Sequence, residues 1–264
     1  VLPFKSIYGR KGRFDGVSIS NKFDGTWETI FKKKEGKETA AVGIFKAHDS
    51  VLKGTFLTKT GDYRFLDGYT LNDTMYLFTF DGNHIYRFRA IKESDSIMKG
   101  EYWSGKTSYK TFISQKNDTA TLPDAKSLTF LKEGYDKIEF SFPDLEGNLT
   151  TLDQERFKYK IIILQILGTW CPNCMYETKF LSEWYNRNAS KGVEIIGLAY
   201  ENKADFEYAK NRVQTMKEKL QVPYDFLIAG TSSTESASES LPMLNKVISF
   251  PTTIIIDKKG IVRR

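Results

Sequence analysis

The feature that most constrains the fold is a pair of cysteines placed directly after an apolar run. Residues 161–167 (Ile-Ile-Ile-Leu-Gln-Ile-Leu) carry almost only large apolar side chains, which is typical of a strand buried on both faces. Cys171 and Cys174 follow this run closely, and the segment after them has helical periodicity. We therefore expect a strand that leads through a short turn into a helix, with Cys171 at the first turn of that helix.

This placement predicts thiol chemistry. Free backbone N–H groups and the positive end of the helix dipole favour a thiolate at the position of Cys171. Pro172 suits the first helical turn, because the N–H that it lacks would have no partner there. Cys174 would lie one turn further in, near enough to bond to Cys171 but deeper below the surface. We predict that Cys171 is the nucleophile, that Cys174 is the resolving thiol, and that their redox-active disulfide serves in place of a cofactor.

A zinc half-site and a structural buried pair are the alternative interpretations of two cysteines at this spacing. Zinc needs four ligands, and the chain has no other cysteine. Its only histidines, His48 and His84, are isolated in the sequence, so we interpret both as structural. We expect neither a metal site nor a cofactor site. Two cysteines also cannot form a disulfide framework, so the fold must depend on its apolar cores.

Composition excludes several other classes of protein. A hydrophobic content of 40% with 27% charged residues is typical of a globular chain. The net charge of +6 is spread along the sequence, and the lysine-rich run 31–38 is interrupted by acids, so we expect no nucleic-acid partner. No apolar run approaches the roughly 20 residues that cross a bilayer. The chain begins at Val1, which we interpret as processing or trimming that could remove a leader.

The periodicity of the apolar residues divides the chain into two halves. Residues 15–116 contain about eight short strands with alternating apolar and polar residues, which predicts an antiparallel barrel or sandwich. Residues 1–14 are expected to form a tail and residues 117–134 a linker. The predicted strands of the first half are 25–27, 40–45, 52–57, 63–66, 74–80, 85–91, 98–103 and 109–113, with turns at Asp67-Gly68 and Asp81-Gly82-Asn83.

Residues 135–264 alternate strands with helices, which predicts an α/β fold with parallel strands. The expected strands are 138–144, 161–167, 193–199, 224–228 and 250–257. The expected helices are 172–188, 203–220 and 242–247.

Two motifs resemble known families. Gly25-Thr26-Trp27 resembles the start of lipocalin-type barrels, although a three-residue match is weak, and we expect the aromatic residues of this half to fill its core. Residues 135–264 resemble the TlpA/ResA branch of the thioredoxin-like family. This resemblance depends on Trp170-Cys171-Pro172-Asn173-Cys174, on Glu177, and on Phe250-Pro251-Thr252-Thr253.

The resemblance implies roles for further residues. Glu177 would tune the thiols, because Gln165 stands where cytosolic thioredoxins carry a buried aspartate. Pro251 would be cis and face the disulfide. The backbone of Phe250 would pair with an extended substrate segment. Trp170, Pro172 and Thr252 would complete the substrate-binding surface.

The complete chain is similar to envelope proteins of Bacteroidetes-type bacteria that join a β-rich half to a thioredoxin-like half. This similarity implies export to the periplasmic side of the envelope and a lipid anchor on a removed N-terminal segment. It implies a thiol–disulfide oxidoreductase that reduces disulfides in protein substrates and receives electrons from a thiol donor. It also implies that the chain stops before the last strand and the closing helix of the fold.

Three alternatives stay open at this point. The protein could be a disulfide oxidase or isomerase, since the Pro172-Asn173 pair does not fix the redox potential. It could also be chiefly a binding module, with a β-domain that holds a ligand or partner and a thioredoxin-like domain that is redox-inactive.

Overall fold

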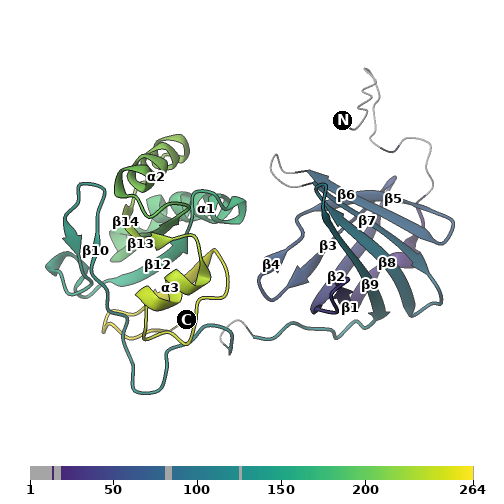
Figure 1. The fold of residues 1–264 in the computed structure, drawn as a ribbon, viewed down its shortest axis with the longest axis horizontal. Helices are drawn as coiled ribbons and strands as arrows, with labels where there is room; N and C mark the ends of the chain where they lie inside the picture. Colours follow the sequence, from purple (N-terminus) through teal and green to yellow (C-terminus); the bar gives the residue numbers. More distant parts are fainter. Residues whose placement is uncertain (1–13, 15–18, 81–84, 125–126, 264) are drawn as a thin grey trace. The chain divides into compact units, whose positions relative to one another are not determined.

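The computed structural model describes residues 14, 19–80, 85–124 and 127–263. The chain divides into two compact units, residues 1–123 and residues 124–264, which are described separately below (Figure 1).

The first unit is an antiparallel β-barrel. In its described residues, eight strands follow one another around the barrel, and β9 pairs with β1 to close it. A ninth strand, β4, extends from β3. The bounds are β1 (Gly25–Lys32), β2 (Glu38–His48), β3 (Val51–Thr58), β4 (Gly61–Asp62), β5 (Leu66–Leu71), β6 (Thr74–Phe80), β7 (Ile85–Lys92), β8 (Ile97–Ser104) and β9 (Ser108–Lys116).

Aromatic side chains fill the core of the barrel. Phe31, Phe56, Phe88 and Phe112 are all almost completely buried, and their rings contact one another in mostly edge-on pairs. Trp27 is also fully buried, and its indole N–H donates to the carbonyl of Phe23 at 2.9 Å in the short 3₁₀ helix η1 (Asn21–Phe23). These five aromatic side chains therefore form a packed core, as the sequence predicts.

Asp67 and Gly68 were predicted as a turn, and that prediction is wrong, because both lie inside β5. A Cβ atom on Gly68 would lie only 1.7 Å from the carbonyl oxygen of Tyr76 on β6. The glycine is therefore required for close approach of two backbones within the sheet. The predicted strand 63–66 correspondingly begins only at Leu66. The predicted turn 81–83 and His84 lie outside the described residues, and His48 is the last residue of β2.

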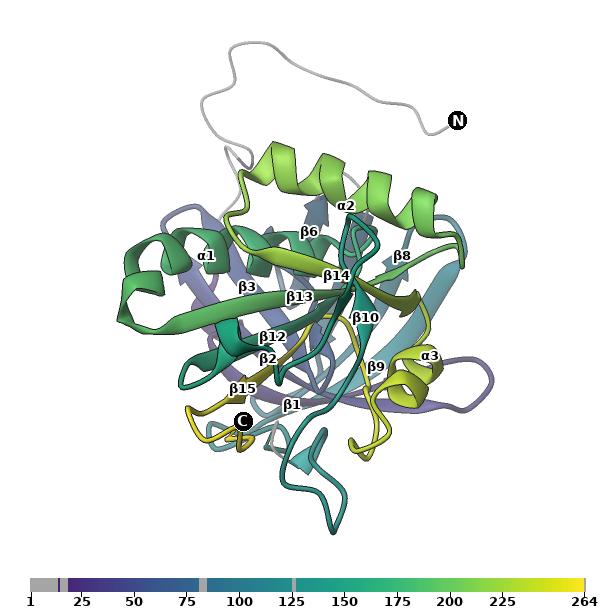
Figure 2. The same ribbon diagram turned by 90° about the vertical axis from the view of Figure 1, so that its left-hand side faces the viewer.

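The second unit is built on a four-stranded sheet of order β14-β13-β12-β15. Its strands are β12 (Ile161–Leu167), β13 (Val193–Glu201), β14 (Asp225–Thr231) and β15 (Thr252–Ile256). The first three are mutually parallel, and β15 is antiparallel to β12. Helices α1 (Pro172–Asn188) and α2 (Phe206–Leu220) cover one face of the sheet and α3 (Thr234–Ser240) covers the other (Figure 2). A short hairpin of β10 (Phe142–Pro143) and β11 (Leu149–Thr150) precedes β12.

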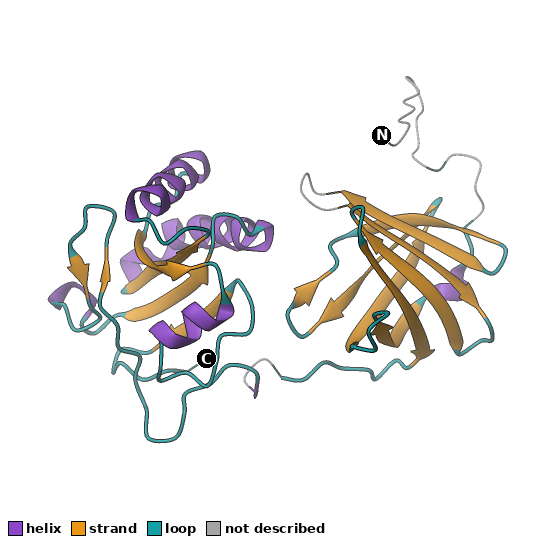
Figure 3. Ribbon diagram, in the orientation of Figure 1, coloured by secondary structure: helices purple, strands orange, loops and turns teal. Residues whose placement is uncertain are grey.

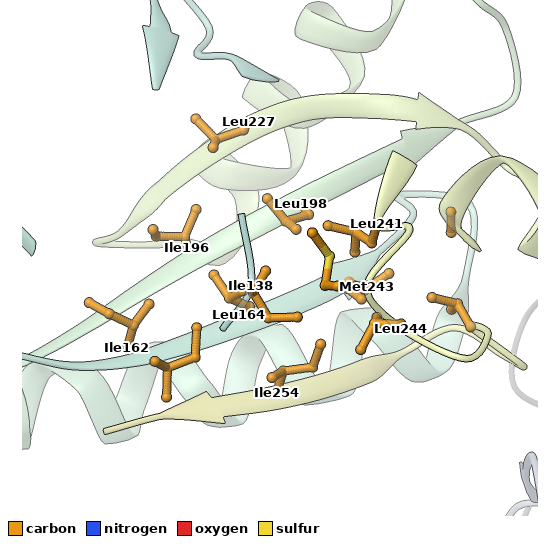
Figure 4. Packing of buried hydrophobic residues seen from close by; sticks show 14 of the residues in the cluster. Ile138, Ile162, Leu164, Ile196, Leu198, Leu227, Leu241, Met243, Leu244 and Ile254 are labelled. Atoms are coloured by element: carbon orange, nitrogen blue, oxygen red, sulfur yellow. The ribbon is translucent and has the colours of Figure 1, made fainter. Parts of the chain in front are cut away.

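Alternate residues of the sheet build two apolar layers. Ile162, Leu164 and Ile166 of β12 face the α3 side, where they pack with Leu198 and Leu241 (Figure 4). Their neighbours Ile163 and Leu167 face α1 and α2, and both cysteines belong to this second layer. A central parallel strand that is buried on both faces explains the continuous apolar run 161–167.

Two predictions for the second unit need correction. The helix expected at 242–247 does not form there; the helix is α3 at 234–240, and its sequence Thr-Glu-Ser-Ala-Ser-Glu-Ser offers no apolar stripe to reveal it (Figure 3). The strand expected at 138–144 is paired only at its end, where 142–143 form β10 and Asp144 bridges to Leu227, although Ile138 is buried and Phe140 packs against the same core.

The segments that precede β10 and follow β15 both form backbone hydrogen bonds within this unit. The backbone N–H of Phe130 donates to Asn245 and that of Lys132 donates to the carbonyl of Met243. After β15, Val262 forms a bridge with Ile256.

Candidate active site

The cysteine pair lies at the junction between β12 and α1. Cys171 is the N-cap residue of α1 and Pro172 is its first residue. The sulfur of Cys171 accepts the backbone N–H of Cys174 at 3.3 Å, which satisfies one of the unpaired donors of the first turn. The two sulfurs are not joined in a disulfide here. Cys171 retains 6% of its surface exposed and Cys174 none, so only Cys171 can meet a disulfide from outside.

The environment of Cys174 keeps that thiol protonated while Cys171 is a thiolate. Burial raises the pKa of Cys174, and the hydrogen bond and negative charge of Cys171, with a smaller contribution from the charge of Glu177, raise it further. One group acts in the opposite direction, since a hydrogen bond from the backbone N–H of Gly168 lowers the pKa of Cys174. The two thiols are therefore chemically distinct.

The loop before β15 faces Cys171. The Phe250–Pro251 peptide bond is cis, as the family resemblance implies, and the Cys171 thiol donates to the Phe250 carbonyl at 3.5 Å. The ring of Phe250 contacts the ring of Trp170 at 5.5 Å between centroids. Thr252 turns back to its own loop, where its hydroxyl donates to the Ser249 carbonyl. The structure thus brings Trp170 and Phe250 to Cys171, whereas the Thr252 hydroxyl is occupied locally.

Glu177 lies one turn beyond Cys174 on α1, and its half-buried carboxylate joins a hydrogen-bonded chain. One carboxylate oxygen accepts Gln165 Nε2 at 2.9 Å and the other accepts the Thr253 hydroxyl at 2.7 Å. The buried Gln165 in turn accepts the hydroxyl of Tyr224 at 3.0 Å. Three elements, β12, α1 and β15, therefore hold the acid that the sequence singles out.

A second acid, Glu201, is also built into the site and was missed at the sequence level. It is the last residue of β13, it is completely buried, and it accepts both the backbone N–H and the hydroxyl of Thr169 at 2.7 and 2.8 Å. Its only sequence signal is an acid at the end of an apolar run. Because parallel strands end at the same edge of a sheet, that position lies beside the turn that follows β12.

The described residues contain no group of three His, Cys, Asp or Glu side chains placed to hold a metal ion. In the same part of the chain, no helix is long and apolar enough to cross a bilayer.

Comparison with known proteins identifies the family. The AhpC/TSA family matches residues 134–264. The thiol:disulfide interchange protein DsbE of Vibrio cholerae is 30% identical over 152 residues, which cover 58% of this chain and 74% of that protein. This chain belongs to the thioredoxin-like thiol–disulfide oxidoreductases. The resemblance drawn from the cysteine and proline motifs is thereby confirmed.

A further relative agrees with this assignment. The thiol–disulfide oxidoreductase ResA of Bacillus thuringiensis is 33% identical over 127 residues, covering 48% of this chain and 65%, or less than two thirds, of that protein. Among solved structures, a thiol–disulfide oxidoreductase from Bacteroides fragilis aligns at 21% identity and a TM-score of 0.38, covering 49% of this chain and 88% of that one.

Proposed function

We propose that the second unit exchanges disulfides through a Cys171 thiolate and a mixed disulfide that Cys174 resolves. The observation that carries this proposal is the asymmetry of the pair. The Cys171 sulfur accepts an N–H at the start of α1, while the Cys174 thiol is fully buried and has a raised pKa. The binding-module alternative, with inactive cysteines, is not favoured by the relatives, which are named as disulfide exchange proteins.

The reaction follows from this asymmetry. The Cys171 thiolate attacks one sulfur of a substrate disulfide, forms a mixed disulfide and releases the other substrate sulfur as a thiolate, which takes a proton from solvent. Cys174 then loses its proton and attacks the Cys171 sulfur. This second step releases the remaining substrate thiol and leaves a Cys171–Cys174 disulfide, so two electrons pass to the substrate. A thiol donor would restore the dithiol.

Residues around the pair would hold the substrate. The Phe250 carbonyl and the adjoining backbone before Pro251 line the approach to Cys171, which suits an extended segment that adds to the edge of the loop. Trp170 and Phe250 offer apolar surface beside the sulfur. Pro172 completes the first turn of α1. These features support a protein substrate that presents its disulfide in an extended stretch.

We also propose that the protein works on the extracytoplasmic side of the cell envelope, attached by a lipid on a preceding segment. The similarity of its sequence motifs to envelope proteins supports this location. The chain contains no cysteine besides the active pair, which avoids incorrect pairing where disulfides form.

The direct test is a trapping experiment. The Cys174→Ser variant is incubated with a peptide that holds one disulfide, and products are analysed by mass spectrometry without reductant. We expect a stable adduct of one peptide on Cys171, because no second thiol can release it. The matched Cys171→Ser variant should form no adduct, since its remaining thiol is buried. An adduct on Cys174 in that control would reverse the assigned roles, and no adduct with either variant would refute the proposed function.

A further inference from the structure

A lysine and three tyrosines lie together at one end of the β-barrel. Along β7, β8 and β9, alternate residues face the core, and this alternation places Tyr86, Tyr102 and Lys110 on the inward side. Tyr102 and Lys110 are direct partners in the register of β8 and β9. Tyr63, from the segment between β4 and β5, packs its ring against those of Tyr86 and Tyr102, at 5.6 and 5.0 Å between centroids. We call these four residues the mouth cluster.

The mouth cluster covers the phenylalanine core at this end of the barrel. The ring of Tyr63 contacts the rings of Phe31 and Phe88, each at 5.5 Å between centroids. Tyr102 is almost completely buried, whereas the other three members of the cluster are half-buried. The apolar core is therefore the floor of the cluster, and solvent reaches its outer side.

The ammonium of Lys110 is held against aromatic rings. Its nitrogen lies 5.5 Å from the ring centroid of Tyr102, 5.8 Å from that of Phe31 and 5.9 Å from that of Tyr63. The ammonium also donates to the Tyr63 hydroxyl at 3.3 Å. Within the described residues, no carboxylate forms an ion pair or a hydrogen bond with this lysine. The surroundings of the charge are thus aromatic and neutral.

These surroundings compensate the charge of Lys110 only in part. Burial lowers the pKa of Lys110, because the ammonium loses hydration there. Burial also raises the pKa of Tyr63 to about 12, so this phenol stays neutral and supplies no negative charge. Cation–π contacts return some of the lost hydration energy. A half-buried ammonium without a paired acid in the described structure is suited to receive an anion.

The polar groups of the mouth cluster favour a singly charged carboxylate. They are one ammonium and three hydroxyls, which are all groups that donate to an oxygen. The Tyr63 hydroxyl accepts from Lys110 and so has its own proton to donate. One ammonium neutralises one negative charge, whereas a doubly charged phosphate would bring an excess charge against an apolar floor.

We propose that the mouth cluster binds a small organic carboxylate, which accepts from the Lys110 ammonium and the Tyr63 hydroxyl above the packed core of the barrel. This inference goes beyond the proposed exchange reaction, because the site belongs to the first unit and uses neither cysteine. The aromatic core stays intact, since the ligand lies on the core and needs no cavity within it.

Titration of the full chain with benzoate tests this proposal. The chain is isotopically labelled, and the amide signals of residues 108–112 are followed by NMR while benzoate, benzamide or inorganic phosphate is added. We expect saturable shifts with benzoate. Benzamide has nearly the same shape but no charge, so it should bind about tenfold more weakly, the effect of losing one hydrogen bond between charged groups. Phosphate should also bind more weakly than benzoate.

Two variants and one matched control assign the site. Lys110→Met should weaken benzoate binding about tenfold, and Tyr63→Phe, which loses one hydroxyl, should weaken it about threefold. The control is Lys116→Met. The Lys116 ammonium is also close to an aromatic ring, 5.9 Å from that of Trp27, but this lysine lies at the opposite end of β9. The control should bind benzoate within about twofold of the wild-type affinity.

Equal affinity for benzoate and benzamide would overturn the proposal, as would tighter binding of phosphate or the lack of a saturable shift with benzoate. An unchanged affinity in Lys110→Met, or equal weakening in Lys116→Met, would do the same. If Lys110→Met loses its circular dichroism spectrum, Tyr63→Phe decides alone, and an unchanged affinity in that variant overturns the proposal. None of these readouts involves the thiols, so their outcome leaves the exchange reaction to its own test.

Discussion

Gln165 provides a test of the buried hydrogen bonds that hold Glu177 in the site. Its amide is fully buried in the middle of β12, where it donates to Glu177 at 2.9 Å and accepts from Tyr224 at 3.0 Å. Gln165→Met keeps the length of the side chain but leaves the buried Tyr224 hydroxyl and one oxygen of Glu177 without this partner. Each buried polar group deprived of a partner costs about 1–3 kcal/mol, so we expect a loss of about 3 kcal/mol. Tyr224→Phe removes only one donor and should cost about 1 kcal/mol.

A double-mutant cycle separates this interaction from general damage to the core. Once Gln165 is absent, the Tyr224 hydroxyl is itself a buried group without its partner, so removing it should cost nothing further. We therefore expect the double variant to be about 1 kcal/mol more stable than the sum of the single effects predicts. Additive losses, within about 0.3 kcal/mol, would refute the reasoning.

The assay can report on the second unit alone. Both cysteines belong to that unit, and Cys174 is fully buried, so brief alkylation at increasing urea concentration reports the unfolding of this unit. The barrel contributes no thiol to the signal. The midpoint and slope of this transition give the free energy of unfolding for each variant.

Three further outcomes are expected. Trp27→Ala should destabilise the barrel by about 3–5 kcal/mol in urea unfolding, whereas the half-exposed Trp103→Ala should cost far less; equal losses would contradict the assigned core. Glu177→Gln should shift the pH dependence of Cys171 alkylation, and an unchanged profile would reduce Glu177 to a surface acid. Because burial raises the pKa of Glu201, its contribution to stability is greatest below the ordinary pKa of a glutamate and declines as pH rises through the raised value. Glu201→Gln should abolish that decline in thermal unfolding curves, and a steeper decline would contradict the sign.

The framework of the cysteine site could be predicted because several local signals coincide there. The apolar run 161–167 became β12, and Pro172 marked the first residue of α1. The helix then ends at Asn188, as predicted. Here local propensity and tertiary packing favour the same structure.

The features that escaped prediction are those that depend on contacts distant in sequence. Gly68 resembles a turn residue, and only the backbone of β6 crossing beside it explains why it lies in a strand. The polar helix α3 begins at the Ser233 cap and buries little besides Ala237, so no periodicity marked it. Glu201 acquires its role only when the parallel pairing of β12 and β13 places it beside Thr169.

The charge on Cys171 couples the two steps of exchange. While Cys171 is a thiolate, its hydrogen bond and negative charge raise the pKa of Cys174, in addition to the larger effect of burial and a smaller contribution from the charge of Glu177. Cys174 therefore stays protonated while Cys171 attacks the substrate. When Cys171 enters the mixed disulfide it loses its negative charge, so its contribution to the raised pKa of Cys174 disappears. The first step of exchange would thereby prepare Cys174 for the second.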